Sequence, residues 1–228
     1  MFRKIHYFGC SYTYGAGLKD RYKERFSYHL SQLFGAPHKN YGIPGSSDYQ
    51  SLYAMMRLQC NNYIQSDDLV VFQWTQPHRH PIPLASEEPE WQPDAAFKFS
   101  EKGRLVNYPF YEMHKPSSFD REQRYFLKSY ISFIDPQAHY MFNNQVLKEL
   151  LDGWAQSRGV ELIQFMSHPF HDGLPISNSW TNETMQQFLD NHGFETDLPC
   201  GHPSAAGHKR WAEHLYFLHQ HRFRNPLI

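Results

Sequence analysis

Residues 69–72 form an uninterrupted apolar run, Leu-Val-Val-Phe, within a chain of 228 residues. A strand with one face in water alternates apolar and polar residues, whereas a continuous run of this length is typical of a parallel strand covered on both faces. Residues 160–166 (Val-Glu-Leu-Ile-Gln-Phe-Met) predict a second strand at or beside the sheet centre. These two runs favour a parallel sheet with helices on both faces.

Segments typical of strands and of helices alternate along much of the chain. The short aromatic segment 4–8 predicts a first strand that stops at Gly9, where the backbone can turn sharply. Apolar residues at helical spacing predict helices over residues 24–33, around residues 52–58 and over residues 204–221. Because parallel strands need covering crossovers, this alternation predicts one α/β domain over residues 1–228.

The middle of the chain departs from this alternation. Residues 77–120 are rich in proline, histidine and aromatic residues without periodicity, and are too long for a plain connection in a compact domain. We interpret them as an inserted lid or substrate-facing region. Residues 123–154 predict one long helix, or two helices broken at Asp135-Pro136, because proline removes a donor and clashes with the preceding turn.

Charge and cysteine content narrow the class of partner. Lysine and arginine total 22 against 23 for aspartate and glutamate, so no net field favours nucleic acid or an anionic membrane. We expect a small neutral substrate instead. The sequence shows no apolar signal region and no run of about 20 apolar residues. Cys10, Cys60 and Cys200 lack disulfide or zinc spacing, which favours a reducing cytoplasm.

Three polar segments follow predicted strands. They are Gly-Cys-Ser at residues 9–11, the small-residue loop 42–47, and residues 74–79. Because the carboxyl ends of parallel strands meet at one edge of the sheet, we expect these segments to converge on one site. The loop before the last helix, which contains His202, can fold back onto the same edge.

Ser11 and His202 are the residues in these segments that fit nucleophilic catalysis. A serine hydroxyl attacks poorly unless a base takes its proton, and a histidine that titrates near neutrality is the usual base. The oxyanion formed on attack needs preorganised donors, which backbone N–H groups at tight turns supply. The amides of Gly45 and Ser11 are the candidates.

Three stretches of this sequence resemble, in the same order, the first, second and last conserved blocks of the SGNH/GDSL hydrolase family. They are Phe-Gly-Cys-Ser-Tyr-Thr-Tyr-Gly at residues 8–15, Asn-Tyr-Gly-Ile-Pro-Gly at residues 40–45 and Gly-His-Pro-Ser-Ala-Ala-Gly-His at residues 201–208. Roughly residues 80–155 match no block.

The resemblance implies a fold, an activity and roles for three residues. The fold would be a flavodoxin-like three-layer α/β/α sandwich with a mostly parallel sheet of about five strands. The activity would be hydrolysis of esters or acetyl esters on sugars, lipids or other small molecules, without a cofactor. Ser11 would be the nucleophile, Gly45 the oxyanion glycine and His202 the general base.

Two family positions differ here. The third block normally ends in Gly-x-Asn-Asp, whose Asn donates to the oxyanion, but residues 70–79 contain no Asn. We take Gln76 as the candidate third donor, and Trp74, His78 and Arg79 as candidate substrate-binding residues.

The family's Asp two or three residues before the histidine is also missing, since Cys200 and Pro199 occupy those positions. Asp197 is the nearest acid and the candidate third member of the triad. Without an orienting group the imidazole takes the wrong tautomer. Either Asp197 or a backbone carbonyl therefore orients His202, or activity is weak.

Other interpretations of the polar residues stay open beside the catalytic one. The metal-ligand types at His78, His80, His168, His171 and Asp172 have no diagnostic spacing, so we expect no metal.

The residues near the proposed catalytic pair also have other interpretations. Cys10 and Cys200 would flank the pair, which raises a thiol nucleophile or redox switch, although buried cysteines usually behave as small hydrophobes. His208 reads as a helix residue that hydrogen-bonds locally.

The leading hypothesis is a serine esterase that hydrolyses an acyl or acetyl ester on a carbohydrate or small metabolite through an acyl-enzyme. The first alternative is a binding protein that keeps the esterase scaffold but has lost efficient chemistry. The second is an acyltransferase that passes the acyl group to a sugar hydroxyl.

Overall fold

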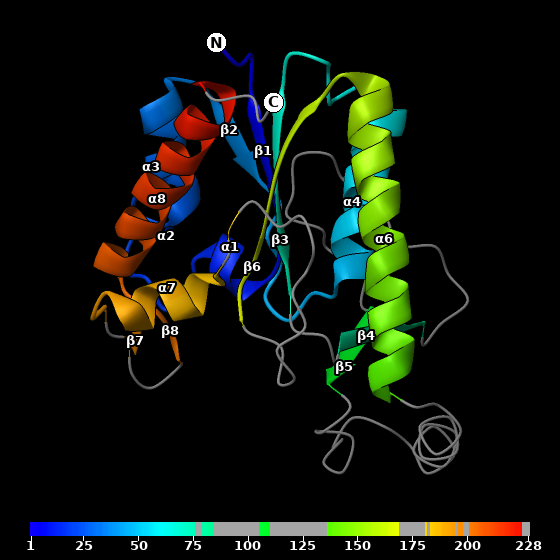
Figure 1. Cartoon of the computed structure of the whole chain (residues 1–228). Coiled ribbons are helices and arrows are strands. Elements are labelled where there is room, and N and C mark those ends of the chain that lie inside the picture. The colour runs from blue at the N-terminus through cyan, green and yellow to red at the C-terminus, as the bar shows by residue number, and fades with distance from the viewer. Residues whose placement is uncertain are drawn as a thin grey trace.

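Four parallel strands form the central sheet in a computed structural model of the chain (Figure 1). They are β1 (Ile5–Phe8), β2 (His38–Asn40), β3 (Leu69–Trp74) and β6 (Glu161–Met166). The structure describes residues 1–75, 79–83, 105–109, 136–168, 181, 183–194, 196–197 and 201–224. The strand order β2-β1-β3-β6 follows the flavodoxin-like pattern, in which the first strand lies between the second and third.

Helices cover both faces of this sheet, which confirms the predicted three-layer α/β/α sandwich. They are α1 (Ser11–Tyr14), α2 (Arg21–Glu24), α3 (Phe26–Phe34), α4 (Asp48–Cys60), α6 (Pro136–Arg158), α7 (Met185–Asn191) and α8 (Ala205–Arg224). In Figure 1, α3 and α8 lie on one side of the strands, while α4 and α6 lie on the other.

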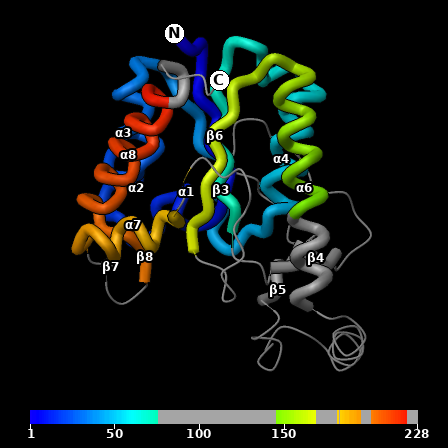
Figure 2. Tube along the Cα trace, viewed as in Figure 1, coloured from blue at the N-terminus to red at the C-terminus, as the bar shows by residue number. Residues whose placement is uncertain are grey.

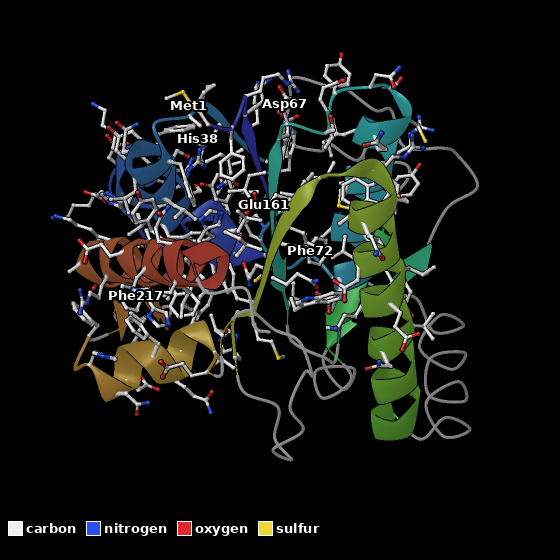
Figure 3. All side chains as sticks on the ribbon, turned by 45° about the horizontal axis from the view of Figure 1, so that its top comes forward. Met1, His38, Asp67, Phe72, Glu161 and Phe217 are labelled. Atoms are coloured by element: carbon white, nitrogen blue, oxygen red, sulfur yellow. The ribbon has the colours of Figure 1, made fainter. Side chains whose placement is uncertain are left out.

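Two hydrophobic cores explain the continuous apolar run of β3. Leu69 and Val71 belong to the core that includes residues of α3 and α8, whereas Val70 and Phe72 belong to the core shared with α4 and α6. Successive side chains of a strand point to opposite faces, so a strand buried on both faces is apolar throughout. Figure 3 shows the labelled Phe72 on the side of α4 and α6.

Helix boundaries differ slightly from those predicted. The predicted helix over residues 24–33 is divided, because Arg25 is extended and separates α2 from α3. α6 begins at Pro136, which is consistent with the first turn of a helix, where proline removes no intrahelical hydrogen bond. The part of the predicted 123–154 helix before Pro136 lies outside the described residues.

The segment interpreted as an insertion contains regular structure that its composition did not predict. β4 (Arg79–Pro83) and β5 (Leu105–Pro109) form an antiparallel pair, and β4 contacts α4. The rest of residues 77–120 lies outside the described residues, and its role as a lid stays a prediction. Within the described part of the chain, no helix combines the length and apolar character needed to cross a bilayer.

A second small pair lies just before the last helix. β7 (Thr196–Asp197) and β8 (His202–Pro203) pair in antiparallel fashion. Figure 2 shows α7 and β8 on the same flank of the sheet as α8. This pair thus carries the His202 segment.

Candidate active site

Ser11 is the first residue of α1, and a tight turn connects it to β1. A Cβ added at Gly9 would lie 2.4 Å from Thr13 Oγ1 and 2.6 Å from Gln73 Oε1, so only glycine fits between them. Ser11 is 8% exposed, and its hydroxyl donates to Cys10 Sγ at 3.8 Å. Its amide lies in the first turn of α1, where N–H groups have no partner within the helix.

Gln73 fixes α1 against the end of β3, a role that the sequence did not indicate. Its side chain is 0% exposed. Its Oε1 accepts hydrogen bonds from the amide of Thr13 at 3.0 Å and from the Thr13 hydroxyl, while its Nε2 donates to Cys10 Sγ at 3.0 Å. The residues on both sides of Ser11 are therefore held by one buried amide. The sequence shows only a polar residue near the carboxyl end of an apolar strand, which does not reveal these partners.

Gly45 lies in a turn that is joined directly to the Gly9 segment. The amide of Ser46 donates to Ile43 O at 3.0 Å across Pro44-Gly45, and Gly45 has a φ of 76°, which is the geometry of a type II turn. Gly9 O accepts from the amide of Ile43 and from the Ser46 hydroxyl, both at 3.0 Å. The second sequence block therefore lies beside the Ser11 turn.

Asn40 and Gly42 join the same loop to α1. Asn40 Nδ2 donates to Thr13 O at 2.6 Å, and its Oδ1 accepts from the amide of Gly42 at 2.9 Å. A Cβ at Gly42 would lie 2.6 Å from the amide nitrogen of Tyr14. The Asn-Tyr-Gly block is therefore explained by close packing of the loop on the α1 backbone.

The amino end of α4 is tied to the end of β3. Ser47 caps α4 by accepting from the amide of Gln50 at 3.2 Å. Asp48 is buried, and its Oδ1 accepts from the amide of Thr75 at 2.6 Å. This contact places Thr75, which directly follows β3, at the same edge of the sheet as Ser11.

The segment with His202 packs against the segment with Ser11. α1 contacts β8, and the ring centroids of Tyr12 and His202 are 5.4 Å apart. In the β7–β8 pair Asp197 lies directly opposite His202. The Nδ1 atom of His202 is shielded from solvent. The Ser11 hydroxyl donates to Cys10 rather than to the His202 ring.

Trp74 lies in the core rather than at a substrate surface. It is 1% exposed, its indole N–H donates to Gln164 Oε1 at 2.9 Å, and its ring packs on Phe72 with centroids 4.8 Å apart. We therefore leave Trp74 out of the residues proposed to contact substrate. Arg79 is described only by its backbone in β4, while Gln76 and His78 lie outside the described residues.

The residues considered as metal ligands or as reactive thiols have the following surroundings in the structure. Across the described residues, no group of three or more His, Cys, Asp or Glu side chains is arranged to hold a metal ion. His168 Nδ1 is 3.0 Å from Ser167 Oγ and its Nε2 is 3.0 Å from Tyr12 Oη. His171, Asp172 and Cys200 and the side chain of His80 lie outside the described parts. Cys10 is buried.

His208 makes a long-range contact instead of the expected local one. Its Nδ1 accepts from the amide of Phe26, the first residue of α3, at 3.2 Å. Burial lowers the pKa of His208 to about 3, and electrostatic interactions with His29, His202 and Arg25 act in the same direction. The neutral imidazole thus caps α3 by satisfying a first-turn N–H.

No family model and no curated protein matches this chain. Solved structures that are similar to it over nearly the whole length include two lipolytic proteins. One is a member of the lipolytic protein G-D-S-L family from Veillonella parvula DSM 2008, with 12% identity, a TM-score of 0.41, and coverage of 97% of this chain and 98% of that one. The other is assigned to the lipolytic G-D-S-L family from Desulfitobacterium hafniense DCB-2, with 11% identity, a TM-score of 0.39, and coverage of 95% and 99%. At this degree of similarity the function must be argued from the site itself.

Proposed function

We propose that this protein is a serine esterase that hydrolyses an acyl or acetyl ester on a carbohydrate or small metabolite. The observation that carries the proposal is the packing of α1, which begins at Ser11, against β8, which begins at His202. These segments come from opposite ends of the chain. A hydroxyl and an imidazole on contacting segments, beside a glycine turn, are the parts that acyl transfer through serine requires.

In the proposed reaction His202 takes the proton of Ser11 as Oγ attacks the ester carbonyl carbon. The oxyanion receives hydrogen bonds from the amides of Ser11 and Gly45. Collapse breaks the bond to the leaving alcohol, which takes the proton from His202, and leaves an acyl group on Ser11. Water then attacks this acyl-enzyme with His202 as base, the bond from the acyl carbon to Ser11 Oγ breaks, and His202 returns the proton to Oγ as the acid is released. The long contact from Ser11 to Cys10 Sγ, at 3.8 Å, is weak enough for the hydroxyl to turn toward His202.

Asp197 is the group that we propose to orient His202. Directly opposed residues of an antiparallel pair project from the same face, with Cβ atoms about 4.5–5.5 Å apart. The register of β7 on β8 supports this role, in which Nδ1–H of His202 would donate to the Asp197 carboxylate. That bond would present Nε2 to Ser11 as the acceptor of its proton.

Three residues that follow β3 complete the proposal. Gln76 would be the third oxyanion donor, and His78 and Arg79 would bind the substrate. Support comes from the hydrogen bond between Asp48 and Thr75, which holds the start of this segment at the edge of the sheet where Ser11 lies.

The test is covalent labelling combined with turnover. Wild-type protein should react with a fluorophosphonate probe at Ser11 and should hydrolyse p-nitrophenyl acetate, whereas Ser11→Ala and His202→Gln should do neither. Ser157→Ala serves as the control, because Ser157 lies on the exposed surface of α6 and its hydroxyl contacts only Trp154 O. A wild-type protein that is neither labelled nor active would contradict the proposal.

One observation favours the alternative of binding without turnover. Ser11 is 8% exposed and its hydroxyl donates to a sulfur atom rather than to a base. Binding of an acetylated oligosaccharide in calorimetry, without release of acetate, would support this alternative. Cys200→Asp restores an acid near His202, so a large gain in esterase rate would instead indicate an intact site that lacks a strong orienting group.

A further inference from the structure

Tyr12 lies where four segments of the chain meet. Its side chain is 2% exposed. Its hydroxyl lies 3.0 Å from His168 Nε2, 2.8 Å from Gln186 Oε1 and 3.3 Å from Gly201 O. These partners follow β6, belong to α7 and precede β8, respectively, while Tyr12 itself belongs to α1. One phenol group thus joins the elements that surround the candidate site.

Two of the partners of the Tyr12 hydroxyl are acceptors. Gln186 Nε2 donates to Asp190 Oδ1 at 2.8 Å, which leaves its Oε1 facing Tyr12 as an acceptor. Gly201 O is also an acceptor. A phenol has one proton to give, so Gly201 O at 3.3 Å shares it with the nearer Gln186 Oε1 at 2.8 Å.

Ser167 contacts the other ring nitrogen of His168. Ser167 Oγ lies 3.0 Å from His168 Nδ1. The amide of Ser167 donates to Trp74 O at 3.1 Å, and its hydroxyl donates to the same oxygen at 3.2 Å. The contacts from Ser167 through His168 and Tyr12 to Gly201 therefore link the end of β3 to the residue before His202.

We propose that Tyr12 is a positioning residue that fixes His202 relative to Ser11, an inference that rests on the proposed esterase function. Tyr12 directly follows Ser11, and Gly201 directly precedes His202. The hydrogen bond from Tyr12 to Gly201 O therefore joins the two segments one residue away from each reacting side chain. The Tyr12 ring, 5.4 Å from the His202 ring at an interplanar angle of 51°, limits the imidazole from one side.

The geometry makes catalysis more sensitive to this contact than folding is. Catalytic groups need placement within about 0.5 Å, and a displacement of about 1 Å can cost about 100-fold in rate. The hydroxyl makes three contacts, but α1 is also held at Thr13 by the hydrogen bonds with Gln73 and Asn40, which do not involve Tyr12. Loss of the Tyr12 hydroxyl should therefore lower kcat strongly and change the KM for substrate little.

The first experiment uses Tyr12→Phe, which keeps the ring and removes the hydroxyl. We expect kcat for p-nitrophenyl acetate and the rate of fluorophosphonate labelling to fall about 10- to 100-fold, with KM within about twofold. Tyr7→Phe is the matched control, because Tyr7 is also buried and its hydroxyl contacts Ser31 Oγ at 3.1 Å on α3. It should keep wild-type kcat.

The second experiment tests the His168 anchor and covers the case in which Tyr12→Phe does not fold. His168→Gln keeps a side-chain amide that can hydrogen-bond the Tyr12 hydroxyl and should retain most of the activity. His168→Leu lacks any hydrogen-bonding group there and should lower kcat as Tyr12→Phe does. Equal activity of the two His168 variants, or wild-type kcat in Tyr12→Phe together with reduced thermal stability, would overturn the positioning role.

Hydrogen exchange separates this inference from the esterase proposal. The amides of Gly201, His202 and Ser204 should exchange faster in Tyr12→Phe than in wild type, whether or not the protein is an esterase. Inactive wild-type protein with this difference would reject the esterase and retain the contact between the segments. Active wild-type protein with unchanged exchange and kcat in Tyr12→Phe would reject the inference alone.

Discussion

Asp197 lies directly opposite His202 in the antiparallel pair that β7 forms with β8. The spacing of the two residues along the chain differs from that of the SGNH/GDSL blocks, where an acid stands two or three residues before the histidine. In the register of β7 on β8 the two residues are nevertheless direct neighbours across the ladder. The proposed role of Asp197 therefore depends on position across a ladder and not on proximity along the sequence.

Asp197→Asn should test whether this carboxylate orients His202. The amide can donate to Nδ1 and so favours the wrong tautomer, the effect that costs about 10⁴-fold in the chymotrypsin-type triad. We expect kcat for p-nitrophenyl acetate to fall at least about tenfold with little change in KM. Glu213→Gln is the control, because Glu213 pairs with Arg210 on the exposed surface of α8. Equal kcat for the two variants would argue for another orienting group.

Gly45→Ala should separate backbone strain from loss of the oxyanion donor. Gly45 has a φ of 76°, where an alanine costs about 1 kcal/mol, although no atom lies within 4 Å of the added Cβ. Gly35→Ala is a close match, since Gly35 has a φ of 64° with the same open space but caps α3 away from the site. Both should lose similar stability in urea unfolding, and only Gly45→Ala should also lose esterase kcat, about tenfold or more.

If Gly45→Ala and Gly35→Ala lose activity to the same small extent, the turn has no special part in catalysis. If Gly45→Ala loses kcat without losing stability, the backbone has adopted another turn and the oxyanion donor has moved with it. The comparison therefore needs both the unfolding curve and the kinetics of each variant.

The sheet was predictable from the sequence because burial on both faces leaves a local mark. β3 and β6 consist largely of apolar residues, because helices cover both faces of the sheet. The pair β4–β5 was not predictable, because Pro81, Pro83 and Pro109 interrupt the usual strand composition. The two-residue strands β7 and β8 are too short to leave any pattern.

The residues of the proposed site also differ in how far the sequence alone could predict them. Ser11, Gly45 and His202 lie in short motifs whose chemistry can be recognised locally. Gln73 and Tyr12 read as ordinary strand and helix residues, and only their long-range partners reveal what they hold. The role of a buried polar side chain depends on its hydrogen-bond partners in the tertiary structure. These partners cannot be identified from a single sequence.

Gln73→Met should therefore affect both folding and the nucleophile. Methionine has a similar volume but leaves the buried amide of Thr13 without its acceptor, which should cost about 1–3 kcal/mol of unfolding free energy. It also removes the donor to Cys10 Sγ and frees the turn before Ser11. We expect slower fluorophosphonate labelling in addition to lower stability.

Gln164→Met provides the comparison for Gln73→Met. Gln164 is also buried, but it bonds Trp74 Nε1 and Asp152 on the side of α6. It should reduce stability by a similar amount while labelling of Ser11 stays near the wild-type rate. Slower labelling in both variants would mean that general loosening of the sheet, and not the contact to α1, controls the nucleophile.

His208 should make the stability of this protein depend on pH below neutrality. Its pKa falls from 6.5 to about 3 in the folded chain because burial disfavours the charged form. Between these values the unfolded chain binds a proton that the folded chain does not, so stability is greatest above pH 6.5 and falls as the pH approaches 3. At pH 5 this difference corresponds to about 2 kcal/mol. His38, whose pKa is lowered to about 4 by burial and by Arg25, acts in the same direction.

His208→Asn keeps an acceptor for the amide of Phe26 but cannot titrate. The unfolding free energy of this variant should therefore decrease less than that of wild type between pH 7 and pH 5. Parallel curves for the two proteins in urea titrations at these pH values would show that His208 does not carry the effect.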